Sequence, residues 1–420
     1  MHNVDVYFGT KKVATIFYAQ DTNEFELLYD EVWILEGFEL SPSLAFNAKS
    51  KSQSIKNFIE NLLPEGNALD FLSTYYQISK SNPFAMIKTI GIETTGALTF
   101  VSSPTELKTQ FREISEKELA QRIRERNSIP LSIWDKKPRL SVAGVQDKLP
   151  IAIIEGKYGF GEGALASTHI FKFNKESLNI VINEYLSMKL AKHAGLNVAD
   201  VDLIKIEELD VLLVKRFDRE LIDAQRVKRL HIIDACQALD LSVGYKYERN
   251  FGSGEHVKNI REGVSYKKIF SLAQLCEIPL VAKKELITWI CVNLILGNSD
   301  AHGKNISFFV ERNKITLAPF YDIVSISLYE AIYEQEMAMA IDDEFNINNL
   351  TPYDFSEFYN AINIHKKIFV NEFKRVTVNI EKALMQQKNE NIFKIEANSS
   401  FIDKYTTNVI NRIKKLLEVI

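Results

Sequence analysis

The chain has 420 residues, of which 46% are hydrophobic and 25% are charged. These fractions are typical of soluble globular proteins and exclude a disordered, fibrous or collagen-like chain. With 51 basic and 55 acidic residues, the formal net charge is −4, which argues against nucleic-acid binding through overall charge. At about 150 residues per domain, the length predicts two to three domains.

The cysteines and the apolar segments indicate the compartment. Cys236, Cys276 and Cys291 lie far apart without CxxC spacing, which argues against a disulfide framework and a structural zinc site. The N-terminus alternates like a strand and lacks the cationic start and long apolar core of a signal peptide. The most apolar stretch, residues 285–296, is too short to span a bilayer. We therefore expect a cytoplasmic protein without membrane segments.

The first 105 residues show strand patterns followed by helix patterns. Alternating apolar residues predict three strands, over about 4–8, 13–18 and 25–29. A helical period then predicts three helices, over 52–63, 67–77 and 82–91, and a strand returns at 96–101. We interpret residues 1–105 as an N-terminal α+β subdomain.

The remaining chain divides at two changes of pattern. Residues 106–139 are polar and charged, which favours a linker with one solvated helix. Residues 140–218 predict a lobe with a helix at 179–194 and strands at 149–154, 167–173, 201–206 and 210–216. Residues 219–420 are mainly helical, with one predicted hairpin between about 305 and 322.

Polar residues flank that predicted hairpin. Asp300 and Asn305 lie in a loop before the strands 306–310 and 315–319, and Asp322 follows them. Because a hairpin returns the chain to its starting point, Asp322 should lie beside Asn305. Two carboxylates and an amide suit a hard cation such as Mg²⁺.

The spacing of Asp300 and Asn305 matches the D-x-x-x-x-N catalytic loop of protein kinases. In that loop the Asp orients or deprotonates the acceptor hydroxyl and the Asn holds a metal, while a later Asp, here Asp322, binds the metal that bridges the phosphates. Upstream, Lys172 lies in an apolar strand and Glu184 on the next helix. A lone strand lysine is usually an edge residue, but beside this set we expect an ion pair that positions the α- and β-phosphates.

A phosphate-covering loop is harder to place because no G-x-G-x-x-G motif follows the first strand. The glycines between 156 and 163 fit a hairpin turn better than a nucleotide loop. Residues 141–148 are the better candidate, since small residues let backbone N–H groups approach phosphate oxygens and Lys148 adds positive charge.

A series of ordered blocks resembles the HipA-like serine/threonine kinases, which are toxins of bacterial toxin–antitoxin modules. These blocks include NLLPEG (61–66), LSVAGVQDK (140–148), STHIFK (167–172), KRFDR (215–219), KYE (246–248), GNSDAHGKN (297–305) and LAPFYDI (317–323). The resemblance covers most of the chain. It implies an α+β, mixed α/β protein-kinase-like fold of two lobes, with an N-terminal α+β subdomain, a nucleotide-binding part at 140–218 and a mainly helical C-terminal lobe at 219–420.

The resemblance also implies site residues. Asp300 would be the catalytic residue, Asn305 and Asp322 the metal ligands, and Lys172 the phosphate-contacting lysine. Ser141 would be an autophosphorylation site whose modification ejects the loop and inactivates the kinase. The nucleotide contacts would come from Ala143, Gly144, Val145, Gln146, Asp147, Lys148, the hinge residues Lys215, Arg216 and Phe217, and from His302, Gly303, Lys304 and Tyr321.

The implied function is that of an ATP- and Mg²⁺-dependent serine/threonine protein kinase, the toxin of a type II toxin–antitoxin system, which causes growth arrest and persistence. The implied partners are a HipB-like helix-turn-helix antitoxin, operator DNA through that antitoxin, and an aminoacyl-tRNA synthetase, such as glutamyl-tRNA synthetase, as substrate. A small-molecule or lipid kinase is one alternative, because the catalytic set does not name its acceptor. A non-catalytic nucleotide-sensing corepressor is the other.

Overall fold

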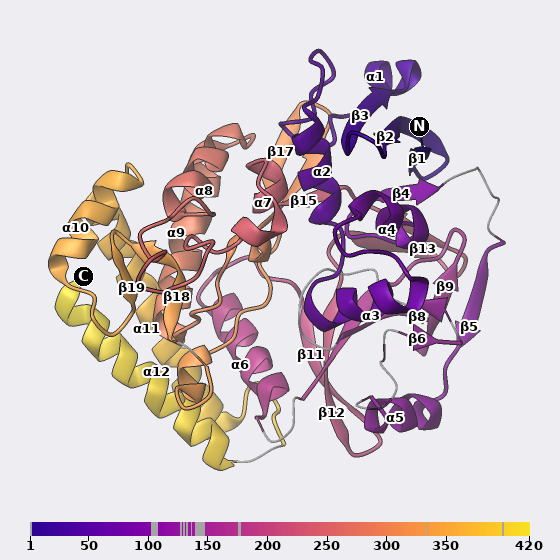
Figure 1. Ribbon diagram of the computed structural model, residues 1–420. Coiled ribbons are helices and arrows are strands. Elements are labelled where there is room, and N and C mark those ends of the chain that lie inside the picture. The colour runs from indigo at the N-terminus through magenta and orange to yellow at the C-terminus, as the bar shows by residue number, and fades with distance from the viewer. Residues whose placement is uncertain are drawn as a thin grey trace. The chain divides into compact units, whose positions relative to one another are not determined.

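The computed structural model describes residues 2–101, 108–126, 128, 131, 133–135, 137–138, 148–174, 178–333, 335–396 and 399–420. Its contacts divide the chain into two compact units, whose elements are labelled in Figure 1. Unit 1 comprises Met1–Asn174, Ile204–Val243 and Phe308–Ala318, and unit 2 comprises Lys175–Leu203, Gly244–Ser307 and Pro319–Ile420. No helix in the described ranges is both long and apolar enough to cross a bilayer.

Unit 1 begins with an antiparallel sheet in the order β3-β2-β1-β4. Its strands are β1 (His2–Phe8), β2 (Lys11–Ala19), β3 (Glu24–Tyr29) and β4 (Leu98–Val101). The helices between β3 and β4 are α1 (Glu31–Glu36), α2 (Ser52–Glu60), α3 (Gly66–Tyr76) and α4 (Pro83–Ile90). These elements confirm the predicted strands and the three predicted helices. The sequence analysis missed α1, whose first turn is capped by the Asp30 carboxylate.

A six-stranded sheet follows, in the order β11-β12-β10-β8-β9-β5. Its strands are β5 (Gln110–Glu113), β8 (Lys148–Ile154), β9 (Lys157–Glu162), β10 (His169–Phe173), β11 (Val201–Ile206) and β12 (Leu209–Lys215). Unit 1 also contains β6 (Ile133–Trp134) paired with β7 (Lys137–Pro138), β13 (Arg219–Asp223) paired with β14 (Arg226–Arg229), the helix α7 (Ala235–Ala238), and the sheet β15 (Ile232–Asp234), β16 (Ser307–Glu311) and β17 (Lys314–Leu317).

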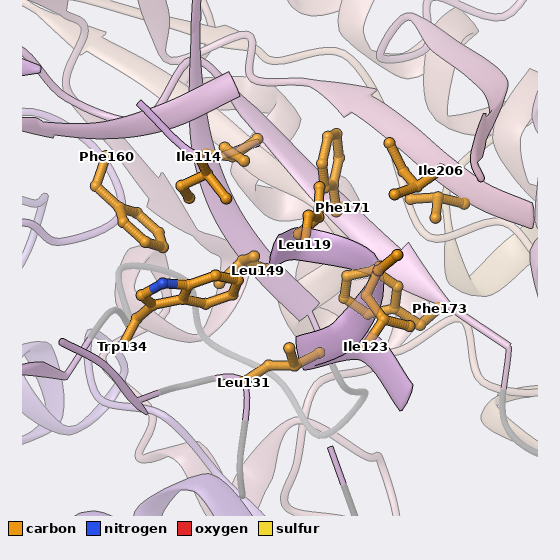
Figure 2. Packing of buried hydrophobic residues seen from close by; sticks show 13 residues of the cluster. Ile114, Leu119, Ile123, Leu131, Trp134, Leu149, Phe160, Phe171, Phe173 and Ile206 are labelled. Carbon is orange, nitrogen blue, oxygen red and sulfur yellow. The ribbon is translucent and has the colours of Figure 1, made fainter. Parts of the chain in front are cut away.

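The segment 106–139, predicted to be a linker, contributes to this sheet and to its core. β5 pairs with β9, and α5 (Glu116–Arg124) buries three side chains. Figure 2 shows the core cluster, in which α5, β8 and β10 contribute. Its buried members are Ile114, Leu119, Ala120, Ile123, Leu131, Trp134, Leu149, Ile151, Phe160, Phe171, Phe173, Ile206 and Val211. The charged outer face of α5 concealed this packing from the sequence analysis.

Of the glycines that predicted a turn, Gly159 and Gly161 lie within β9. Gly156 occupies the turn before β9, with φ +78°, and Gly163 a turn after it, with φ +70°. Gly159 pairs with the residues of β5, and a Cβ there would lie 2.5 Å from the Phe111 ring. This glycine therefore makes room for an aromatic side chain of the neighbouring strand, which explains why a strand carries so much glycine.

Unit 2 is built around α9 (Pro279–Leu296), which is buried along most of its length. The other helices are α6 (Ile180–His193), α8 (Tyr266–Leu272), α10 (Pro352–Ala361), α11 (Lys366–Glu390) and α12 (Ser399–Val419). Helices α11 and α12 pack on α9. A hairpin of β18 (Glu336–Ile341) and β19 (Glu344–Asn346) completes the unit. Like β13 and β14, this hairpin was not predicted, whereas the hairpin β16–β17 confirms the prediction for 305–322.

The three cysteines are free and buried. The division of the chain at residues 105, 139 and 218 stays a prediction.

Candidate active site

The loop that carries Asp300 begins at the C-terminus of α9. Gly297 ends the helix with φ +67°, and a Cβ at this position would lie 2.3 Å from the Ser327 hydroxyl. Arg412 of α12 donates from Nη2 to the backbone oxygen of Leu294 at 3.0 Å, which satisfies a carbonyl of the last turn. The start of the loop is therefore fixed by its own helix and by α12.

Asp300 and Asn305 are brought together within the loop. The Asn305 side-chain amide donates to the backbone oxygen of Asp300 at 3.2 Å, and the backbone N–H of His302 donates to the same oxygen at 2.9 Å. Asp300 is exposed, whereas Lys304 and Asn305 are only 7% and 5% exposed. The Asp300 carboxylate is thus exposed to solvent on a loop whose neighbouring residues Lys304 and Asn305 are buried.

The chain returns to this loop after β17. The Tyr321 hydroxyl donates to the backbone oxygen of Lys304 at 2.6 Å and lies 2.8 Å from the Ser307 hydroxyl. Tyr321 therefore lies beside the residues that flank Asn305. Asp322 is the next residue along the chain.

Asp322 has a constrained backbone. Its φ is +56°, in the left-handed region that Asp and Asn tolerate better than most residues. On one side, Phe320 exchanges backbone hydrogen bonds of 2.9 Å with Asn197 and Ala199. On the other side, Ser325 donates its N–H to the Asn183 side chain of α6 at 2.8 Å. The backbone of Asp322 is therefore held between two hydrogen-bonded neighbours.

The oxygen donors of this part of unit 2 could hold a hard cation. Asp300, Asn305 and Asp322 offer two carboxylates and an amide oxygen, and Mg²⁺ binds through one or two carboxylates together with substrate phosphates. In the described residues, no three His, Cys, Asp or Glu side chains cluster as a metal cage. Two carboxylates and an amide oxygen are the donor types that a Mg²⁺ ion shared with a phosphate ligand takes.

Two lysines of unit 1 lie opposite each other in the six-stranded sheet. Lys172 of β10 pairs with Lys148 of β8 in the antiparallel register. Residues directly opposite in such a pair share a face of the sheet, where like charges repel. Lys172 belongs to unit 1 and Glu184, which is 1% exposed on α6, to unit 2, so their predicted ion pair stays a prediction.

The predicted hinge follows β12, and its side chains differ in role. Lys215 is exposed, and the Phe217 ring meets Phe309 edge to face at 6.0 Å. Arg216 is 4% exposed and binds Asp218 through Nε at 2.9 Å and Nη2 at 2.7 Å, and Ser167 through Nη1 at 2.9 Å. The Arg216 side chain is thus engaged inside unit 1, and its backbone N–H donates to the oxygen of Thr168 at 3.0 Å. The nucleotide contact expected for Arg216 stays a prediction.

The sequence analysis did not detect the buried polar cluster around Arg216. Asp218 also accepts from the N–H of Gly96 at 2.9 Å, and Arg219 donates to the backbone oxygens of Gly96 and Thr94, each at 2.7 Å. Burial alone would raise the pKa of Asp218, but Arg216 and Arg219 hold it well below its ordinary value. No local sequence motif predicts the contacts with Gly96 and Thr94, because these residues lie more than a hundred positions from Asp218 and Arg219.

Six of the predicted site residues lie outside the described residues: Ser141, Ala143, Gly144, Val145, Gln146 and Asp147. Gly303 begins a short 3-10 turn that ends at Asn305, and its backbone N–H donates to the oxygen of Lys246 at 2.9 Å. Tyr247, next to Lys246, contacts Asp300 and was given no role by the sequence analysis.

A mixed α/β chain with an Asp-x-x-x-x-Asn loop, a hairpin and a following Asp has the features of a protein-kinase-like enzyme. Residues 4–101 match the family model of the HipA N-terminal domain, and residues 140–384 match that of the HipA-like C-terminal domain. The chain belongs to the HipA family of serine/threonine-protein kinase toxins.

Individual relatives agree with this assignment. The chain is 41% identical over 420 residues to the serine/threonine-protein kinase toxin HipA of Shewanella oneidensis, covering 99% of this chain and 96% of that protein. A solved structure of the Shewanella oneidensis MR-1 toxin–antitoxin system HipA, HipB and its operator DNA complex matches with a TM-score of 0.91 and 40% identity, covering 99% of this chain and 98% of that one. A putative kinase, Y4mE, of Sinorhizobium fredii is 29% identical over 337 residues, 77% of each protein.

These findings confirm the predicted family, the predicted kinase-like fold class and the predicted protein kinase activity. They disfavour the two alternatives, a small-molecule or lipid kinase and a non-catalytic corepressor.

Proposed function

We propose that this chain transfers the γ-phosphoryl group of ATP to serine or threonine hydroxyls of a protein, with Asp300 as the catalytic residue. The observation that carries this proposal is the exposed Asp300 carboxylate on a loop whose neighbouring Asn305 is buried and bonded to the Asp300 backbone. An exposed carboxylate on a fixed loop can orient an incoming hydroxyl and accept its proton.

In the proposed reaction, the acceptor hydroxyl attacks the γ-phosphorus, and a new O–P bond forms while the bond to the β,γ-bridging oxygen breaks. Asp300 takes the hydroxyl proton, and ADP leaves with the electron pair of the broken bond. Lys172 and Lys148, opposite each other in unit 1, supply positive charge for the phosphates. The backbone of Lys215, Arg216 and Phe217 contacts the adenine.

Asn305 and Asp322 are the proposed Mg²⁺ ligands, because an amide oxygen and a carboxylate are hard donors on fixed backbone segments. Bound there, Mg²⁺ would neutralise charge that develops on the phosphates. We expect Asp322→Asn to remove most of the gain in ATP affinity that Mg²⁺ gives the wild-type chain, measured by titration with and without EDTA. Asp342→Asn is a matched control, since Asp342 has a similar φ of +55°. An Asp322→Asn chain with the full Mg²⁺ effect would contradict this assignment.

Ser141 is the proposed autophosphorylation site. A phosphate adds about −1.5 to −2 charges at neutral pH, which disfavours a position next to the phosphates of ATP. We expect mass spectrometry to find phosphate on Ser141 after incubation with ATP, and the modified chain to lose transfer activity. An equally active phosphorylated chain would contradict the inhibitory role.

The proposed partners are a HipB-like helix-turn-helix antitoxin and, through it, operator DNA. Support comes from the Shewanella structure, which holds HipA, HipB and operator DNA. The net charge of −4 makes direct DNA binding unfavourable. We expect this chain to shift operator DNA in a gel only together with its antitoxin. A shift by the chain on its own would contradict the proposal.

The proposed protein substrate is an aminoacyl-tRNA synthetase, such as glutamyl-tRNA synthetase, whose modification in the cytoplasm would block translation and cause growth arrest. The resemblance to HipA-like kinases supports it. The test is incubation of the chain with labelled ATP, Mg²⁺ and a cell lysate, followed by identification of the labelled protein. Label on a synthetase supports the proposal. Label confined to other proteins would contradict the proposed substrate but not the kinase activity. The absence of any label would favour the corepressor alternative.

A further inference from the structure

The phenol of Tyr247 contacts the carboxylate proposed to be catalytic. Its hydroxyl donates to Asp300 Oδ1 at 2.6 Å, a short hydrogen bond of the kind that a charged acceptor makes. Tyr247 is 37% exposed and Asp300 is exposed, so the contact lies at the surface of the site and not in a core. The Tyr247 ring meets the His302 ring edge to face, with centroids 5.1 Å apart.

The segment 245–248, which carries Tyr247, is attached to the catalytic loop and to the segment before α8. The backbone oxygen of Lys246 accepts from the N–H of Gly303 at 2.9 Å, and that of Tyr245 accepts from Val264 at 2.8 Å. The packing is close, since a Cβ on Gly263 would lie 1.8 Å from the Tyr247 backbone oxygen. The backbone of Tyr247 therefore has little freedom.

Glu248 anchors the same segment in the interior. It is 4% exposed, and its Oε1 accepts from Arg261 Nε at 2.8 Å and Nη2 at 2.6 Å. Its Oε2 accepts from the N–H of Ala340 at 2.8 Å. Burial raises the pKa of Glu248, and the hydrogen bond from Ala340 and the charge of Arg261 oppose that rise. A buried carboxylate with partners on both oxygens is a rigid attachment point.

Strand β18 is hydrogen-bonded to the neighbours of both Tyr247 and Asp300. Ala338 accepts from the N–H of Glu248 at 2.9 Å and donates its own N–H to the oxygen of Ser299 at 2.8 Å. Glu248 follows Tyr247, and Ser299 precedes Asp300. The phenol and the carboxylate are thus fixed relative to each other through a shared strand residue.

We propose that Tyr247 is a positioning residue of the phosphoryl transfer: its hydroxyl holds one oxygen of Asp300, so that the other faces the acceptor hydroxyl. This inference rests on the proposed role of Asp300. The terminal torsion of an aspartate is broad, and an exposed carboxylate without a donor rotates freely. A donor on one oxygen restricts that rotation, and small errors in the placement of a reacting group cost large factors in rate.

The test compares Tyr247→Phe with wild type in phosphoryl transfer from labelled ATP to the protein that wild type labels in a lysate. Removing the hydroxyl should lower kcat about tenfold while KM for ATP and for the acceptor stay within about twofold, since the phenol orients the base and binds neither substrate. Tyr245→Phe removes a hydroxyl from the same segment and should leave kcat unchanged. Equal thermal unfolding temperatures would show that both variants are folded.

The rates of the two variants test the positioning role of Tyr247 and the catalytic role of Asp300 separately. An unchanged kcat for Tyr247→Phe would overturn the positioning role. A higher kcat or a lower KM for the acceptor would also overturn it, since the phenol would then block the place of the acceptor hydroxyl. Asp300→Asn separates this proposal from the proposed function: full activity of that variant would overturn the catalytic role of Asp300, whereas an inactive Asp300→Asn beside a fully active Tyr247→Phe would overturn the positioning role only.

Discussion

Asp218 and Arg216 form a bidentate ion pair at the end of the predicted hinge, with Oδ1 to Nε at 2.9 Å and Oδ2 to Nη2 at 2.7 Å. Asp218 also accepts from the backbone of Gly96, which precedes β4 of the first sheet. The hinge segment is therefore joined to the first hundred residues by a buried charge and not only by apolar packing. The N-terminal residues thereby stabilise the segment proposed to contact the nucleotide.

Asp218→Asn should lower the free energy of unfolding by about 3 kcal/mol, because Arg216 and Arg219 would keep buried positive charge without its partner. Urea unfolding followed by fluorescence measures the change. Asp223→Asn, on the exposed end of β13, should change it by less than about 0.5 kcal/mol. Equal unfolding midpoints for the two variants would show that the buried ion pair adds little.

His231 makes the stability of unit 1 depend on pH. It is 4% exposed, its Nε2 hydrogen-bonds to the oxygen of Leu40 at 3.0 Å, and burial lowers its pKa to about 4. The unfolded chain binds a proton near pH 6.5 that the folded chain does not bind until about pH 4. This contribution to stability is therefore intact above about pH 6.5 and decreases as the pH falls toward 4.

Because of His231, the free energy of unfolding should fall by about 2 kcal/mol between pH 7.5 and pH 5.0. Urea unfolding of His231→Gln and wild type at both pH values measures it, since the variant should lack this part of the pH dependence. His256→Gln, at an exposed position, should behave like wild type. If His231→Gln kept the full pH dependence of stability, groups other than His231 would be its source.

Gly297 fixes the start of the catalytic loop through both its backbone and its surroundings. Gly297 and Gly156 both have positive φ, at +67° and +78°, but only Gly297 is crowded, by Ser327 and Arg412. Gly156→Ala should cost about 1 kcal/mol of stability from backbone strain. Gly297→Ala should cost about 3 kcal/mol, because overpacking adds to the strain. Equal losses, measured by urea unfolding, would argue against the crowding at Gly297.

Elements with a strong local signal could be predicted from the sequence. Periodicity placed β1, β2, β3 and α2 to α4, and the loop from Asp300 to Asn305 stood out because its spacing belongs to kinase chemistry. The hairpin β16–β17 followed from two short apolar runs around a polar turn. These signals depend on neighbours in sequence, so one chain suffices to reveal them.

Other features depend on partners far apart in the chain. The contact of Asp218 with Gly96 joins residues 122 positions apart, and the contact of Tyr247 with Asp300 joins residues whose separation carries no pattern. The strand β9 was hidden because Gly159 makes room for the Phe111 ring and Gly161 lies close to Leu165. Such contacts become visible only when the fold places their partners.

Asp300→Asn tests most directly whether Asp300 is the catalytic carboxylate. Asparagine keeps the size of the side chain but cannot accept the hydroxyl proton, so the rate of transfer from labelled ATP to the acceptor should fall at least a hundredfold. ATP affinity should stay close to wild type, and Asp202→Asn, which changes an exposed aspartate of β11, should transfer at the wild-type rate. An Asp300→Asn chain that transfers phosphate at the wild-type rate would contradict the account.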